Sequence, residues 1–206
     1  MPTLIGFDDD IFHSESGNGI KINDGDDTTF GWHDIIGQVE LRGSGPNDPS
    51  FAVYGGYSGI RQYEFSPTTM NQVWMVFHVP HDWVPGTPVY FHAHWSNAAA
   101  APNTGNVVWG FEYTWAKGFN QAPFPTPVTA TVTQACPATR YQHMIAETTA
   151  QTLTGLEVDA LVIVRVYRDA TNVADTCTDA VFLHTADIHY QSTGIPTKNK
   201  APDFYA

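Results

Sequence analysis

The stretch VVWGFEYTWAK, residues 107–117, alternates bulky apolar side chains with small or polar ones. In an extended chain, side chains two residues apart lie on the same face. One face of this segment therefore carries Val107, Trp109, Phe111, Tyr113 and Trp115, and the other carries Gly110, Glu112 and Thr114. The pattern predicts a β-strand whose aromatic face lies in a core.

The same two-residue period recurs along most of the chain. It predicts nine or ten strands, within residues 37–43, 51–54, 60–65, 71–79, 87–95, 107–117, 128–134, 141–148, 159–169 and 180–190. Helices long enough for the crossovers of a parallel α/β fold are not predicted. We therefore expect an all-β protein built as an antiparallel two-sheet sandwich, in the form of a jelly roll.

We expect three parts along the chain. Residues 1–35 have little periodicity and many Asp, Gly and Asn residues, which predicts an irregular N-terminal arm of loops with room for one short strand. Residues 36–190 should form the sandwich. Residues 191–206 should form an extended C-terminal tail, which carries the aromatic pair Phe204 and Tyr205 near its end.

The composition indicates a surface that is partly covered by neighbouring subunits. Charged residues make up only 15% of the chain, below the usual quarter. The segment NQVWMVFHV, residues 71–79, is apolar on both faces. A strand of this kind lies either deep in a sandwich or at a subunit interface, so we expect an oligomer.

The net charge of −12 argues against direct binding to nucleic acid and to anionic membranes, because both need cationic side chains. Much of the acidity lies in residues 7–27, which carry seven of the acidic side chains: Asp8, Asp9, Asp10, Glu15, Asp24, Asp26 and Asp27. Such a run is usually solvated surface. Its alternative role is to bind cations or a basic patch on a partner.

The first residues, MPTLIGFDDD, lack the basic and apolar regions of a signal peptide, so none is expected. No apolar run reaches the roughly 20 residues that cross a bilayer, so we expect a soluble protein. Cys136 and Cys177 fit no CxxC motif. Two free thiols are the favoured interpretation for a reducing cytosol, and a disulfide is the alternative.

The stretch PVYFHAHWSN, residues 88–97, carries an HxH pair in a predicted strand. Tyr90, His92 and His94 should share one face, with Trp95 on the other. An HxH pair supplies two metal ligands on one face, and Asp187 with His189 in ADIHY supply further donors on another strand. The metal hypothesis therefore comprises His92, His94, Asp187 and His189, with Glu112 as another candidate carboxylate.

The order of the residues argues against an enzyme of the cupin type. A cupin follows its HxH pair closely with a glutamate, whereas here the next carboxylate is Glu112. The favoured interpretation is therefore an interface role, with no cofactor and no catalytic residue. A structural divalent metal, a cupin-like metalloenzyme and a sugar-binding surface of exposed aromatic residues remain alternatives.

Other catalytic motifs are absent from the sequence. There is no GxSxG nucleophile elbow, and GSGPND and YGGYSG lack the lysine and helix of a phosphate loop. The stretch NDGDDTTFGWHD resembles a calcium loop but has no glutamate at the twelfth position. Paired carboxylates of a glycosidase stay an open alternative, because residue spacing in a β fold does not exclude them. We therefore do not expect an enzyme.

Three phrases, WHDIIGQVELRG, FHVPHDWVPGTPVYFHAHWSN and ADIHYQSTGIPTKNKAPDFYA, resemble a family of tailed-bacteriophage proteins encoded among virion genes. The resemblance covers the chain from about residue 32 to its end. It departs from the family pattern at Ile195, where the family has Gly, so we expect the geometry of the tail to differ from that of the family.

The resemblance implies a structural protein of the virion, assembled in the host cytoplasm. It is most compatible with a jelly-roll decoration (cement) protein that forms a homotrimer and bridges capsomers of the major capsid protein. We expect six residues at its interfaces: Tyr90, His92, His94, Trp95, Phe204 and Tyr205. A tail-appendage module that binds receptor glycans is the alternative.

Overall fold

The computed structural model describes residues 12–15, 19–23, 28–41, 47–56 and 59–205, and these contain no helix. They form twelve strands: β1 (Phe12–Glu15), β2 (Gly19–Asn23), β3 (Thr28–Ile36), β4 (Ser50–Val53), β5 (Arg61–Phe65), β6 (Asn71–His78), β7 (Tyr90–Asn97), β8 (Asn106–Ala116), β9 (Val128–Ala135), β10 (Met144–Glu147), β11 (Leu161–Arg168) and β12 (Val181–Ser192).

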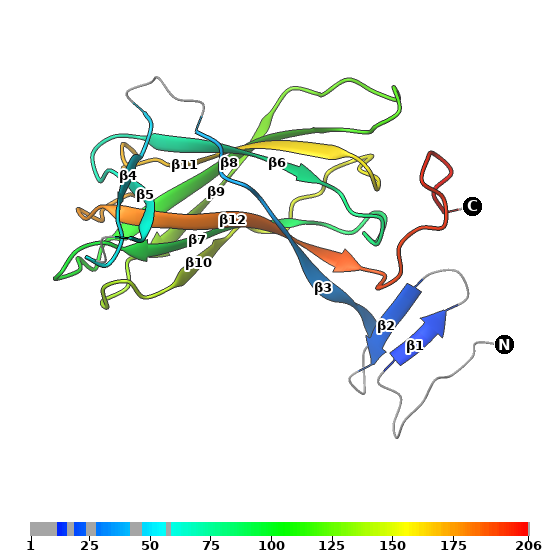
Figure 1. Ribbon diagram of the computed structural model, residues 1–206, viewed down its shortest axis with the longest axis horizontal. Helices are drawn as coiled ribbons and strands as arrows, with labels where there is room; N and C mark the ends of the chain where they lie inside the picture. The colour runs from blue at the N-terminus through cyan, green and yellow to red at the C-terminus, as the bar shows by residue number, and fades with distance from the viewer. Residues whose placement is uncertain (1–11, 16–18, 24–27, 42–46, 57–58, 206) are drawn as a thin grey trace.

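The strands form two antiparallel sheets that face each other (Figure 1). The smaller sheet has the order β6-β11-β8-β9. In the eight-stranded sheet, the long strand β12 has β7 on one side, and β5 and β3 on the other. Strand β10 extends this sheet beyond β7, β4 extends it beyond β5, and β2 and β1 extend it beyond β3. The predicted all-β, two-sheet sandwich is confirmed, and its finer assignment as a jelly roll stays a prediction.

The core lies between the two sheets and is lined by the apolar face of each strand. Phe91 and Trp95 of β7 meet Phe111 and Trp109 of β8, and all four side chains are fully buried. Strand β11 places Val164 against them from the centre of the smaller sheet. The aromatic face of residues 107–117 thus lies in the core, as the sequence predicts, because burying these side chains removes apolar surface from water.

Strand β12 changes its phase at a bulge. Its pairing with β7 shifts between Leu183 and Thr185, so His184 is an extra residue in the ladder. Before the bulge, odd-numbered Leu183 faces the core; after it, even-numbered Ala186 and Ile188 do. A bulge inserts one residue and therefore exchanges the two faces of the rest of a strand. Because of it, Asp187 points away from the core.

Nine of the predicted strand segments contain a strand, but the segment at residues 37–43 contains none in the part that the structure describes. In the described part of that segment, residues 37–41, Glu40 makes only one bridge, to Trp74 of β6. Here the chain crosses from β3 in one sheet to the edge of the other. Val39 and Leu41 pack against the core, so the alternation is real although no ladder forms.

The two ends of the chain differ from the predicted loops and extended tail. Residues 28–36 form β3, which pairs with β12 from Ile36 to Gly31, and the β1–β2 hairpin continues from it beyond the sandwich (Figure 1). At the other end, β12 continues to Ser192, and Phe204 folds back into the core. The acidic run at residues 7–27 lies largely outside the described residues.

The favoured interpretation of two free thiols is wrong, because Cys136 and Cys177 form a disulfide. The Cys136 amide donates to the carbonyl of Gly105, and the Cys177 amide donates to that of Asn106. Both cysteines therefore flank the start of β8, with their Cα atoms 6.5 Å apart, a normal separation for a disulfide.

Among the described residues no helix has the length and hydropathy needed to span a membrane.

Candidate functional site

A polar cluster lies on the outer face of the eight-stranded sheet, where β10, β7 and β12 run side by side. Phe91, Ala93 and Trp95 of β7 point into the core, so the intervening residues point outward, as the sequence predicts. These include His92 and His94. Although His92 faces outward, only 1% of its side chain is exposed, because neighbouring polar side chains cover it.

His92 lies between two carboxylates that the strand register places beside it. Glu147 of β10 is its direct partner on one side, and Asp187 of β12 is its partner on the other. His92 Nε2 is 2.5 Å from Glu147 Oε2, and His92 Nδ1 is 3.4 Å from Asp187 Oδ1. Both ring nitrogens of one imidazole therefore face acidic groups.

His94 is held at the exposed edge of the same cluster. Its Nε2 is 3.0 Å from Asp187 Oδ2, and its Nδ1 is 2.8 Å from His143 Nε2 in the residue before β10. On the far side of His92, His189 Nε2 is 2.5 Å from Asp34 Oδ1 of β3. The cluster thus ties four adjacent strands together through their side chains.

Two further histidines at the cluster are held neutral. Burial, followed by the nearby His143 and His94, lowers the pKa of His184 to about 4. Its Nε2 lies 2.9 Å from the hydroxyl oxygen of Ser96. Burial also lowers the pKa of His189. Desolvation disfavours the charged form of an imidazole, so neither residue supplies positive charge to neutralise the carboxylates at pH 7.

The donors are close enough to form two groups that share His92. One group is His92, His94 and Asp187, and the other is His92, Glu147 and His189; within each, the ligand atoms lie within 4.8 Å of one another. The structure therefore brings together all four residues of the metal hypothesis, but not around one point. Glu147 is an addition that spacing alone did not identify, since nothing local shows that β10 pairs with β7.

Glu112 does not belong to this cluster. It lies on β8 in the smaller sheet, and its carboxylate accepts a hydrogen bond from Arg165 at 2.9 Å. The suggestion that Glu112 supplies the carboxylate for the HxH pair is therefore wrong. Sequence distance misled the prediction, because the next carboxylate in the chain lies on a different sheet.

The residues expected at interfaces are placed very differently from one another. Trp95 is fully buried in the core, and Phe204 is 3% exposed and packs against His81 and Phe119. Interface roles for these two side chains are therefore wrong. Tyr90 is partly buried on the outer face beside Trp32, whereas Tyr205 is 53% exposed. Interface roles for Tyr90, His92, His94 and Tyr205 stay predictions.

No protein-family model matches this chain, and no curated protein matches it either.

Proposed function

We propose that this chain is a structural protein of a tailed-phage virion, a decoration protein that binds the capsid as a homotrimer and bridges its capsomers. The three phrases that resemble phage virion proteins support this function. The observation that carries it is a group of exposed apolar side chains on the outward face of the four-stranded sheet.

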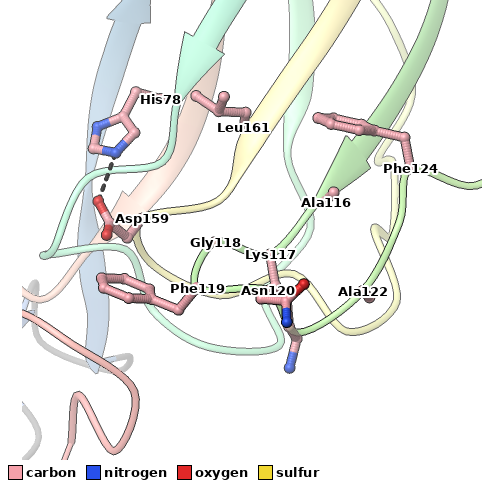
Figure 2. A pocket seen from close by; sticks show the side chains of 10 residues that line it. All are labelled: His78, Ala116, Lys117, Gly118, Phe119, Asn120, Ala122, Phe124, Asp159 and Leu161. Carbon is pink, nitrogen blue, oxygen red and sulfur yellow. Dashed lines mark hydrogen bonds and ion pairs between the residues drawn. The ribbon is translucent and has the colours of Figure 1, made fainter.

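This apolar patch consists of neighbours in the strand register together with the loop beside them. Val76 of β6 is paired with Ile163 of β11. Leu161 lies two residues before Ile163 in β11, so the two side chains share one face of the sheet. Phe119 and Phe124, in the connection from β8 to β9, line a hollow of ≈ 420 Å³ together with Leu161 (Figure 2). These five side chains are between 39% and 53% exposed.

A soluble protein rarely leaves adjacent aliphatic and aromatic side chains exposed unless a partner covers them. The occupant that we assign to the apolar patch is a second copy of this chain in the trimer. The hollow is polar at one border, where His78 Nε2 lies 2.7 Å from Asp159 Oδ1 (Figure 2). An apolar centre with a polar rim is the usual anatomy of an interface between subunits.

The net charge of −12 supports the other contact, with the major capsid protein. An acidic protein is complementary to a basic patch on the outside of a capsid, and it is repelled by packaged DNA. A decoration protein that binds only the assembled shell stabilises it by mass action. No membrane or nucleic acid takes part in this function.

Cryo-electron microscopy of the virion tests the proposal. We expect density for this chain on the outside of the head, in groups of three between capsomers. Density restricted to the tail would overturn the decoration role and support the receptor-binding alternative. A chain that is missing from purified virions would overturn both.

A further inference from the structure

Two buried acceptor atoms face each other in the outer-face cluster. Among the described residues, neither His92 Nδ1 nor Asp187 Oδ1 has a hydrogen-bond partner. The atoms are 3.4 Å apart, and their side chains are 1% and 6% exposed. A buried polar atom without a partner costs about 1–3 kcal/mol, and more if it is charged. The fold accepts this cost at two atoms in contact.

The hydrogen bond on the other side of the ring explains why the pair is unsatisfied. His92 Nε2 is 2.5 Å from Glu147 Oε2, and a carboxylate only accepts, so Nε2 carries the proton. In the neutral imidazole Nδ1 then holds a lone pair, directed at a carboxylate oxygen that also holds lone pairs. A cation between the two atoms satisfies both.

His94 completes the set of donors. Its Nε2 is 3.0 Å from the second oxygen of Asp187, on the same side as His92 Nδ1. Its Nδ1 is hydrogen-bonded to His143, which orients the ring. Metal-binding histidines usually have their other nitrogen held in this way, by a carboxylate or another polar group. Glu147 does so for His92, and His143 does so for His94.

We propose that His92 Nδ1, His94 Nε2 and the Asp187 carboxylate bind one divalent transition-metal ion of the zinc class. Two imidazole nitrogens and one carboxylate are a donor set for zinc, whereas calcium and magnesium prefer oxygen ligands alone. Three protein ligands leave a fourth position for water or for a group from another molecule. The ion joins β7 to β12 at the point where the bulge redirects β12.

The second group of donors is not assigned a metal. Glu147 and His189 have side chains that are 48% and 33% exposed, so water reaches them. Glu147 already accepts from His92, and His189 is already bonded to Asp34. Glu147 and His189 therefore have partners without an ion, whereas His92 Nδ1 and Asp187 Oδ1 of the first group have none among the described residues.

Metal analysis of the purified full-length protein tests the proposal, independently of its place in any virion. After chelation, incubation with zinc and dialysis, we expect one zinc ion per chain by mass spectrometry, and a higher melting temperature with zinc than without. His94→Ala should abolish the bound equivalent. His143→Ala should keep the stoichiometry but weaken affinity roughly 10- to 100-fold. The matched control, His33→Ala, removes an exposed histidine that contacts Tyr190 and Asp82 rather than the donors, and it should change neither the stoichiometry nor the affinity.

Asp187→Asn separates a metal site from a simple ion pair. The new amide can donate to His92 Nδ1, so this variant should lose zinc while the metal-free protein keeps or raises its melting temperature. If His92 were instead an imidazolium between two carboxylates, the variant would melt lower and the parent would bind no zinc. Either of these results would overturn the proposal. So would zinc binding that is lost in His189→Ala and kept in His94→Ala.

Discussion

At the scale of single residues, Arg168 shows how this fold satisfies a fully buried charge. Its guanidinium donates to both carboxylate oxygens of Asp175, at 3.0 and 2.8 Å, and to the carbonyls of Cys177 and Asp179. Neither charged side chain is exposed. The pair organises the loop that connects β11 to β12, since all three acceptors lie in that loop.

Removing the negative member of this pair should be costly. We expect Asp175→Asn to lower the free energy of unfolding by about 3–5 kcal/mol, because it leaves a buried guanidinium without its counter-ion. Glu112→Gln is the control, since Glu112 pairs with Arg165 in a half-exposed position and should cost less than about 1 kcal/mol. Urea denaturation measures both variants. Equal losses would show that burial does not decide the energy of these pairs.

At the scale of elements, the bulge in β12 decides which side chains meet. Without the extra residue His184, Asp187 would lie on the face of Leu183 and point into the core. With it, Asp187 lies beside His92 on the outer face. The sequence predicts that Asp187 and His189 share a face. It does not show the bulge at His184, which decides whether that face is the core face or the outer face.

The disulfide joins the end of β9 to the loop before β12, across 41 residues of sequence. We expect the double variant Cys136→Ser with Cys177→Ser to lose about 4 kcal/mol of stability, because the unfolded chain is no longer constrained by that loop. Thermal melting checks this. A reducing agent should lower the melting temperature of the parent and leave the double variant unchanged. Two titratable thiols in the native, oxidised parent would contradict the prediction.

At the scale of the whole molecule, each sheet buries one face in the core. The two sheets differ in the side chains that their outer faces carry. The outer face of the eight-stranded sheet carries the polar cluster of histidines and carboxylates. The outer face of the four-stranded sheet carries the apolar patch. The segment NQVWMVFHV sends Val73, Met75 and Phe77 into the core and leaves Val76 44% exposed, and a subunit interface over its outer face stays a prediction.

A charge in the apolar patch should separate the subunits. We expect Ile163→Glu to convert the proposed trimer to monomers in sedimentation velocity, because the carboxylate would have to be buried without a partner. Circular dichroism should stay unchanged, since the side chain is already 39% exposed. Thr133→Glu, exposed on the same sheet at the far end of β9, is the control and should stay trimeric. A monomeric parent protein would contradict the proposed interface.

Much of the architecture could be predicted because it depends on local pattern. The alternation in residues 107–117 determines which side of β8 is buried, since neighbouring side chains of a strand always point in opposite directions. The same rule placed His92 and His94 together and opposite Trp95. It also gave Trp95 its true position, in the core, although an interface role was expected for it.

By itself, then, the sequence determined nine of the twelve described strands, the buried face of strands such as β8, and the two-layer class of the fold, because each of these depends on residues a few positions apart. Only the tertiary structure decided the partners: Glu147 beside His92, Cys136 beside Cys177, and Phe204 in the core. These contacts join segments that are tens of residues apart. They depend on strand order, register and one bulge, which are set by the packing of the whole chain rather than by any local repeat.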